Sequence, residues 1–345
     1  MAYTTIKKPS DYFNTVTYVA NQTDDRQITV GFQPDFTWLK DRDQAVSHDL
    51  YDAVRGATKS ISSNNANSEA TQTDGLKSFN STGFTLGTGW GNQTTGDDYV
   101  SWNWLTNNTS GSSNTDGSTT STVSANTTSG FSIVKYTGPG GASTVGHGLG
   151  SAPKVVIVKN ITAPYNLGWR VYHYSAGATK TLYLNENNAA TTDSAVWNNT
   201  APTSTVFSVG SASEVSADYT DFIAYCFTDV KGFSKIGSYT GNGNADGTFI
   251  YTGFKPAWFL FKNNDSLGSW IIKDNKRLGY NGIIPHLQAN TNDTENTDGW
   301  SEVDFLSNGI KLRNADSSMN GSGVSFIYMA FAEEPLVGDN PATAR

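Results

Sequence analysis

The stretch Gly253-Phe-Lys-Pro-Ala-Trp-Phe-Leu-Phe-Lys-Asn263 decides the fold, because the chain contains it in three versions. A glycine, a proline three residues later, and a lysine followed by Asp or Asn recur at the same offsets in residues 31–41 and 150–160. A short, nearly continuous apolar run between turn residues is typical of a strand in a sandwich core. Proline is tolerated at the first residue of a strand, where its missing N–H breaks no ladder bond. The three copies indicate an internal repeat.

The repeat extends on both sides of this strand. An opening tyrosine stands 13 or 14 residues before the glycine in each copy, at Tyr18, Tyr136 and Tyr239. An aromatic closing strand ends each copy and begins at Tyr99, Phe222 and Phe326. Shorter matches lie between them, such as Gly83-Phe-Thr-Leu86, Val206-Phe-Ser-Val209 and Gly309-Ile-Lys-Leu312. From opening tyrosine to closing strand the copies span 81, 86 and 87 residues, so they are modules of equal size.

The composition favours an all-β fold. Asn, Ser, Thr and Gly number 32, 36, 42 and 34, together 144 of the 345 residues, whereas 16% of residues are charged and 12% aromatic. Disordered chains have few aromatic and many charged residues, so wholesale disorder is excluded. Thr and the aromatic residues favour strands, and Asn and Gly favour tight turns. We therefore predict three tandem β-sandwich modules of about 100 residues, jelly-roll-like or Greek-key in topology.

The repeat divides the chain into six segments. Residues 1–10 are expected to form an N-terminal arm and residues 336–345 a C-terminal tail. The β-sandwich modules are expected at residues 11–106, 130–231 and 232–335. Residues 107–129 are rich in Ser, Thr, Asn and Gly, and they form either a flexible linker or a polar edge hairpin that turns at Asp116-Gly117. Val123 and Ala125 stand at strand spacing, which favours partial order.

The net charge, the hydropathy and the single cysteine limit which partners and which cellular compartment are expected. The net charge is −8 and no run of Lys and Arg exceeds two residues, which argues against nucleic-acid binding. No apolar run reaches the length of a membrane-spanning helix, and the first residues lack the apolar stretch of a secretory signal. Cys226 is the single cysteine, so no disulfide can form within the chain. We expect synthesis in a cytoplasm and no membrane insertion.

The residue types that carry catalysis or bind metals show no recognised pattern. The histidines, His48, His147, His173 and His286, lack zinc-site spacing, and no CxxC or HExxH motif occurs. Cys226 lies in an apolar strand, where a thiol packs as a small hydrophobe. Asp97-Asp98 and Glu333-Glu334 are sequence neighbours, and such residues on a strand point to opposite faces. We therefore predict no catalytic, cofactor or metal site and no enzymatic activity.

Two loop features have the composition of ligand-binding loops but lack the pattern of one. The glycine-rich stretches at residues 136–141 and 239–243 are interpreted as turns, because no helical pattern follows them. Loop 242–247 could hold calcium through its oxygens, but it lacks the spacing of an EF-hand loop.

Exposed aromatic residues act as stacking platforms in sugar-binding sandwiches. Four tryptophans are expected mainly in the core: Trp38 and Trp258, assigned to one repeat position where the second copy has Val156, and the corresponding pair Trp169 and Trp270. Three lie in polar surroundings and are candidates for exposed contacts: Trp90, Trp197 and Trp300.

The order of these motifs resembles repeats in virion structural and tail-fibre-like proteins of marine bacteriophages. The shared pattern is Tyr-Thr-Gly, Gly-Phe-x-Pro with an apolar strand ending in Lys, a Trp strand, an Asn-rich middle and an aromatic closing strand. The opening Met1-Ala-Tyr-Thr-Thr-Ile-Lys-Lys-Pro-Ser10 and the segment Tyr51-Asp-Ala-Val-Arg-Gly-Ala-Thr-Lys59 also look like parts of such proteins. The resemblance covers residues 10 to 335 and implies no catalytic residue. The first copy departs most, with Tyr18-Val-Ala-Asn21 in place of Tyr-Thr-Gly.

The resemblance implies a non-enzymatic protein of the phage particle surface, a tail fibre, spike or appendage for host-surface attachment. Its expected partners are other tail or capsid proteins and a host surface glycan or receptor, without cofactors. A capsid decoration protein (head fibre or cement), a carbohydrate-binding module array and a polysaccharide depolymerase are the alternatives. Phage fibres are usually symmetric, and self-association lets small β modules bury more apolar surface, so a homo-oligomer is expected, with a trimer favoured.

Overall fold

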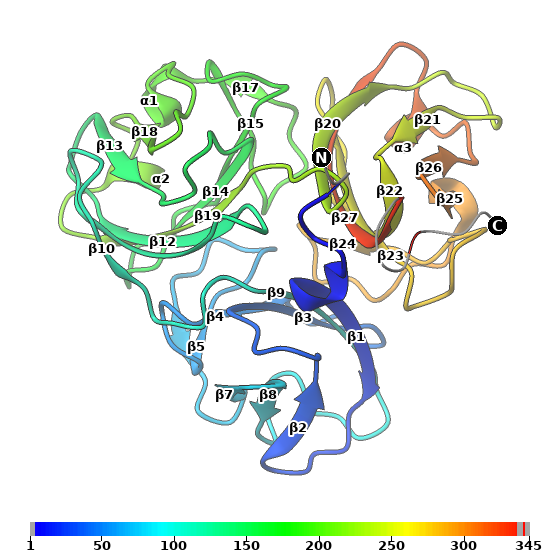
Figure 1. The fold of residues 1–345 in the computed structure, drawn as a ribbon, viewed down its shortest axis with the longest axis horizontal. Coiled ribbons are helices and arrows are strands. Elements are labelled where there is room, and N and C mark those ends of the chain that lie inside the picture. The colour runs from blue at the N-terminus through cyan, green and yellow to red at the C-terminus, as the bar shows by residue number, and fades with distance from the viewer. Residues whose placement is uncertain (1–3, 337–340, 342–345) are drawn as a thin grey trace.

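The computed structural model describes residues 4–336 and 341 and shows three β lobes arranged around a common centre (Figure 1). We refer to residues 13–104, 112–227 and 234–335 as lobes 1, 2 and 3. In each lobe a larger antiparallel sheet faces a smaller one, and the few helices are single turns. The predicted all-β class is confirmed, and the paired sheets are consistent with β-sandwich modules.

Lobe 1 contains a sheet of four strands and a sheet of three. The larger sheet has the order β1 (Phe13–Val19), β9 (Asp98–Trp104), β3 (Phe36–Asp41) and β4 (Asp49–Asp52). The smaller has the order β2 (Arg26–Thr29), β8 (Gly83–Leu86) and β7 (Leu76–Asn80), and a separate pair joins β5 (Lys59–Ser60) to β6 (Ala70–Thr71). The short 3-10 helix η1 (Pro9–Asp11) leads into β1.

Lobe 2 has the largest sheet, of six strands. Its order is β10 (Ser112–Asn114), β11 (Ser121–Asn126), β12 (Phe131–Thr137), β19 (Asp221–Phe227), β14 (Val155–Asn160) and β15 (Arg170–His173). Two strand pairs complete it, β13 (Ser143–Gly146) with β18 (Val206–Val209) and β16 (Lys180–Thr181) with β17 (Thr191–Thr192). The helices are α1 (Ser194–Trp197) and α2 (Ser213–Ser216). Strands β10 and β11 form an antiparallel hairpin, so part of segment 107–129 extends this sheet.

Lobe 3 pairs a sheet of five strands with one of three. The larger has the order β20 (Ser234–Thr240), β27 (Ser325–Pro335), β22 (Phe254–Asn263), β23 (Ile271–Asp274) and β24 (Leu287–Gln288). The smaller has the order β21 (Phe249–Tyr251), β26 (Gly309–Leu312) and β25 (Val303–Leu306). The single turns are α3 (Ser317–Asn320) and η2 (Gly299–Ser301).

The opening tyrosine of each repeat fixes the register of the larger sheet. Tyr18, Tyr136 and Tyr239 stand directly opposite the first aromatic residue of the closing strand, at centroid separations of 5.5, 5.1 and 4.9 Å. Each hydroxyl donates to a backbone carbonyl, of Gly91, Val215 and Met319 respectively. A stacked cross-strand pair with a satisfied hydroxyl stabilises the same register in all three lobes.

The apolar run of each repeat is buried on both faces of its sheet. In β22, Phe259 and Phe261 point into the core of lobe 3, whereas Trp258 and Leu260 point into a core that all three lobes share. A strand covered on both faces needs apolar residues at every position, which explains why the run does not alternate. The register corrects one prediction: Trp258 stands opposite Phe331 and matches Phe36, which stands opposite Trp104, so Trp38 and Trp258 do not share a repeat position. Both are nevertheless buried, as predicted.

Three aromatic residues meet at the centre of the shared core. Trp104, Phe227 and Phe331 occupy the same position in their closing strands, and their ring centroids lie 6.3, 5.7 and 6.0 Å apart. This near-equilateral triangle places a pseudo-threefold axis through the molecule. The three lobes therefore form a closed ring within one chain.

The same hydrogen bonds recur at each of the three junctions between lobes. A ring nitrogen before β4, β15 or β23 contacts a backbone carbonyl of the next lobe: His48 Nε2 with Gln288 at 3.0 Å, Trp169 Nε1 with Ser62 at 2.9 Å and Trp270 Nε1 with Tyr183 at 2.8 Å. A backbone hydrogen bond crosses each junction in the opposite sense, from the N–H of Glu69, Ala190 and Glu295 to the carbonyl of Ile161, Asn264 and Arg42 respectively. These bonds, repeated around the axis, fix the lobes against one another.

A buried Asp–Arg pair reinforces two of the junctions, and the corresponding positions of the third, all within the described part of the chain, hold no such pair. Asp52 pairs with Arg55 and accepts a hydrogen bond from Tyr225 of lobe 2. Asp274 likewise pairs with Arg277 and accepts one from Trp102 of lobe 1. At the junction of lobes 2 and 3, His173 stands at the position of the aspartate, Ala176 at that of the arginine and Met329 at that of the aromatic donor.

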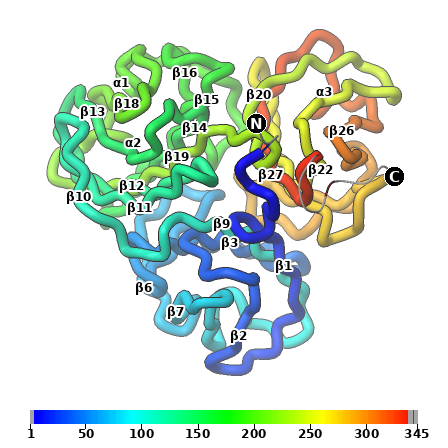
Figure 2. The backbone as a smooth tube through the Cα atoms, in the orientation of Figure 1, coloured from blue at the N-terminus to red at the C-terminus, as the bar shows by residue number. Residues whose placement is uncertain are grey.

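The N-terminal segment packs against the centre of the molecule. Ile6 is buried in the shared core, and Figure 2 shows the N-terminal segment crossing near the centre of the three lobes. Most of the expected tail 336–345 lies outside the described residues. Within the described part of the chain, no helix has the length and apolar character needed to span a membrane.

Candidate functional site

The histidines are parts of the packing. His48, His173 and His286 are fully buried, and burial lowers their pKa values to about 3, 4 and 3. His48 accepts a hydrogen bond from Trp38 through Nδ1, which leaves Nε2 to donate to Gln288. His147 is buried too, and its Nε2 lies 3.2 Å from the carbonyl of Thr203. Among the described residues, no group of three His, Cys, Asp or Glu side chains is arranged to hold a metal ion.

The other nucleophilic or acidic candidates also serve structure. Burial raises the pKa of the Cys226 thiol, which lies inside the core of lobe 2. Burial raises the pKa of Asp49 to about 8, which makes it a protonated, neutral carboxyl group at pH 7. Glu333 accepts a hydrogen bond from Tyr280 and pairs with Lys255.

A lysine at the end of each repeat strand binds backbone carbonyls at a lobe edge. Lys159 Nζ donates to Ala66 and Leu167 at 2.9 and 2.7 Å, and Lys262 Nζ donates to Asn263 at 2.7 Å. Burial lowers the pKa of Lys40 to about 8, of Lys159 to about 7 and of Lys262 to about 8. Lys40 likewise donates to the backbone carbonyls of Asp41 and Gln44. The shared repeat position and the carbonyl acceptors identify the three lysines as structural groups.

The tryptophans divide differently from the prediction. Trp169 and Trp270 are buried and hold the junctions, as expected for core residues. The prediction for Trp197 was wrong: it is buried in the core of lobe 2 against Tyr172, because α1 folds its side chain inward. Trp300 is half-buried against His286, and Trp90 is partly exposed. Trp90 belongs to lobe 1, Trp197 to lobe 2 and Trp300 to lobe 3.

The calcium candidate at residues 242–247 has its oxygens occupied. The side chain of Asn320 donates to Asn242 and to the carbonyl of Asn244, and Asp246 pairs with Lys311. These internal contacts fold the loop back on itself as a turn.

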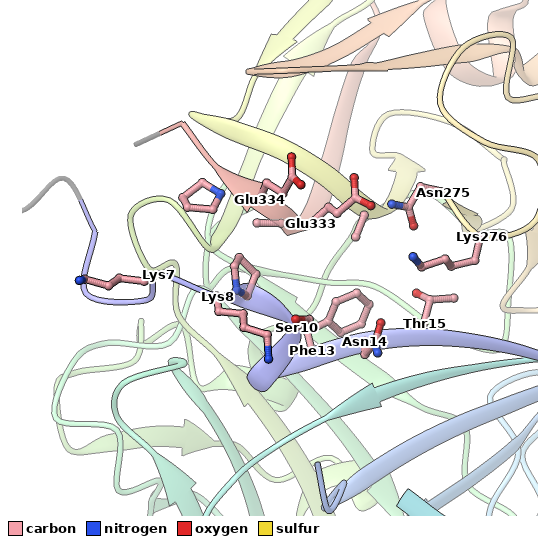
Figure 3. A pocket seen from close by; sticks show the side chains of 14 residues that line it. Lys7, Lys8, Ser10, Phe13, Asn14, Thr15, Asn275, Lys276, Glu333 and Glu334 are labelled. Atoms are coloured by element: carbon pink, nitrogen blue, oxygen red, sulfur yellow. The ribbon is translucent and has the colours of Figure 1, made fainter. Parts of the chain in front are cut away.

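A cleft of about 600 Å³ lies between β1 and the edge of lobe 3. Figure 3 shows Phe13, Asn14 and Thr15 on one side of it and Asn275, Lys276, Glu333 and Glu334 on the other. Both carboxylates pair with Lys255, at 3.0 Å from Glu333 and 3.7 Å from Glu334. Sequence reasoning missed this cleft, because its two walls are 260 residues apart in the chain and carry no motif.

Two polar side chains of the cleft are buried without a protein partner. Thr15 and Asn275 are 3% and 5% exposed, and neither the Thr15 hydroxyl nor either atom of the Asn275 amide has a hydrogen-bond partner among the described residues. Buried polar side chains are nearly always hydrogen-bonded. Other buried groups of the described chain also lack a partner, such as the indole N–H groups of Trp104 and Trp258, but Thr15 and Asn275 lie in the lining of the cleft. A neutral amide and a hydroxyl donate and accept hydrogen bonds but supply no nucleophile or acid–base pair.

A match to a known protein family spans all three lobes of the chain. Residues 8–335 match a family described as a domain of unknown function (DUF7483). None of the curated proteins matches the chain.

Proposed function

The chain belongs to the DUF7483 family, and we propose that it is a non-enzymatic structural protein of the bacteriophage particle, a tail fibre, spike or appendage for attachment to the host. The observation that supports this role is the aromatic triangle of Trp104, Phe227 and Phe331, which joins three lobes into one body. A rigid three-lobed body without disulfides suits a surface component that acts by contact.

The chemistry of the described residues agrees with a contact role. Two buried ion pairs, Asp52–Arg55 and Asp274–Arg277, are engaged at the junctions between lobes. The protein's partners in this proposal are other tail or capsid proteins and a host surface glycan or receptor. A net charge of −8 is unfavourable for binding nucleic acid.

The ring changes the argument for trimer formation. The apolar surface that small modules would bury in a trimer is buried here between lobes of one chain. A homotrimer of this chain would then form through the outer surfaces of the lobes, and not to bury the apolar faces of the modules. Light scattering of the full chain at micromolar concentration distinguishes a 37.1 kDa species from a threefold larger one.

Localisation on purified particles tests the proposal. Antibody labelling or cryo-electron microscopy should place the chain on the virion surface, with the major capsid protein as positive control and a non-structural phage protein as negative control. Copies at the tail would support attachment, and copies over the capsid lattice would favour the alternative of a decoration protein. Absence from particles, or release of reducing ends from host polysaccharide by the purified chain, would overturn it.

A further inference from the structure

We propose that the cleft between β1 and lobe 3 binds a neutral saccharide unit, with Thr15 and Asn275 as the side chains that recognise its hydroxyl groups. This inference deepens the attachment role proposed above and rests on it for its biological meaning. The binding itself is a property of the isolated chain.

The cleft lies where the pseudo-threefold repeat is broken. Thr15 stands opposite Trp102, and the corresponding positions in lobes 2 and 3 are Ile133 and Ile236, which are fully buried in the shared core. Thr15 is as buried as these isoleucines, but it adds an unpartnered hydroxyl to an otherwise apolar position. On the opposite wall, Asn275 follows Asp274 where lobe 1 has Ala53 after Asp52. A hydroxyl therefore replaces apolar side chains on one wall, and on the other wall an unpartnered amide stands where lobes 1 and 2 have Ala53 and Tyr174.

The unpartnered atoms of Thr15 and Asn275 have hydrogen-bonding capacity that a ligand can use. An unpaired buried amide or hydroxyl has lost its hydration without gaining a protein partner, so a ligand that supplies the missing hydrogen bonds is favoured over an empty cleft. The Asn275 amide offers donors and an acceptor side by side, and the Thr15 hydroxyl offers both. Adjacent hydroxyl groups of a sugar ring match this combination, because each also donates and accepts.

The charges and size of the cleft narrow the ligand class. The lining carries charges of both signs, because Lys7, Lys8 and Lys276 stand in it together with Glu333 and Glu334, which pair with Lys255. Neither an anion nor a cation therefore meets charge of one sign only, which favours a neutral ligand. The exposed Lys276 stands at the opposite wall. Ala257, Ala332 and Phe13 supply apolar lining suited to the C–H face of a sugar. A cleft of about 600 Å³ lies within the size range of small-molecule sites.

Direct titration tests the inference. The full chain is titrated with D-glucose, D-galactose and N-acetyl-D-glucosamine, with binding followed by NMR shifts of the Asn275 side-chain amide and by calorimetry. We expect at least one of these sugars to bind and to shift the Asn275 amide signals. Thr15→Ile installs the residue of the other two lobes, so this variant should fold, keep or raise its thermal midpoint, and weaken sugar binding at least about tenfold.

Two further variants complete the experiment. Asn275→Ala should weaken binding by a similar factor, whereas Thr17→Val, at an exposed position of the same strand, should leave binding unchanged. No binding of any of the three sugars, or binding that is equally strong in Thr15→Ile and Asn275→Ala, would overturn the inference. Because particle localisation is measured separately, its result distinguishes failure of the cleft from failure of the structural role.

Discussion

The indole N–H of Trp102 donates a hydrogen bond of 3.0 Å to the carboxylate of Asp274, 172 residues further along the chain. This bond joins the first lobe to the last and closes the ring. At the next junction, the hydroxyl of Tyr225 makes the corresponding bond to Asp52 at 2.7 Å. Both carboxylates are fully buried and each is paired with an arginine three residues later, so the aromatic donor satisfies a charged group that has no access to water.

Removing one donor at a junction should destabilise the whole chain. Tyr225→Phe deletes only the hydroxyl that bonds to Asp52, and a hydrogen bond to a charged group contributes about 1.5–3 kcal/mol to the free energy of unfolding. Urea unfolding of the variant should show a loss of that size. Tyr219→Phe is the matched control, because Tyr219 is 88% exposed and its change should have no measurable effect. Equal stabilities of the two variants would show that the junction bond contributes nothing.

A glycine in the smaller sheet of lobe 1 should not tolerate a methyl group. A Cβ at Gly83 would lie 1.9 Å from the backbone carbonyl oxygen of Ile28, and one at the corresponding Gly309 would lie 2.3 Å from that of Ile250, so both would clash. Gly83→Ala should therefore cost more than about 2 kcal/mol in the free energy of unfolding, measured by thermal denaturation. Gly141→Ala is the control, since its Cβ would meet no atom within 4 Å, and a change within about 0.5 kcal/mol is expected. A comparable loss in the control would contradict this steric explanation.

Acid should destabilise the ring through its buried histidines. Burial lowers the pKa values of His48, His173 and His286 to about 3, 4 and 3, whereas in the unfolded chain they are about 6.5. Between these values the unfolded state binds more protons, so stability is present above pH 6.5 and falls as the pH drops, by up to about 1.4 kcal/mol per unit for each histidine. Asp49 acts in the opposite direction, because its folded pKa of about 8 lies above its unfolded value.

Unfolding by urea at pH 7 and pH 5 measures this dependence. The midpoint should be lower at pH 5. In His173→Gln the difference between the midpoints at pH 7 and pH 5 should become smaller, because the contribution of His173 to the pH dependence is removed. This expectation holds whether or not the variant changes stability at pH 7. A midpoint that does not change between the two pH values would show that the buried histidines do not govern acid unfolding.

Mild alkali should stabilise the chain through its buried lysines. The folded pKa values of Lys40, Lys159 and Lys262 are about 8, 7 and 8, below the value of about 10.4 in unfolded chains. In this window the unfolded state holds more protons, so stability rises with pH until the lysines of the unfolded chain lose theirs. We expect a higher urea midpoint at pH 9 than at pH 7. Lys159→Met should reduce that gain, and an unchanged gain would exclude Lys159 as one of its sources.

The sequence alone predicts the all-β class and the repeat, because both depend on residues close together in the chain. Tyr18 and Tyr99, recognised as the first and last marks of a copy, prove to be directly paired across strands. The predicted match of Trp38 with Trp258 was wrong, although the offsets from Gly31 and Gly253 already align Trp258 with Phe36. The error of two residues changes the repeat position but keeps the same face of the strand.

The ring and its cleft could not be predicted from sequence. Ring closure depends on pairs such as Trp102 with Asp274, whose side chains resemble many others in the chain until the lobes are placed. The burial of Trp197 depends on the single turn of α1, which lies within a polar, turn-rich segment. Thr15 and Asn275 are ordinary residues of a chain rich in Thr and Asn, and only their burial without partners makes them notable.

The aromatic triangle shows what is gained by fusing three copies into one chain. In an assembly of three identical subunits, one codon change alters three positions at once, so no junction can change alone. Here Trp104, Phe227 and Phe331 are encoded separately, and each junction can evolve on its own. The junctions do differ: one has no Asp–Arg pair at the corresponding positions, and another has Thr15 where the other lobes have isoleucine. Such a molecule keeps the rigidity of a trimer while presenting three distinct faces.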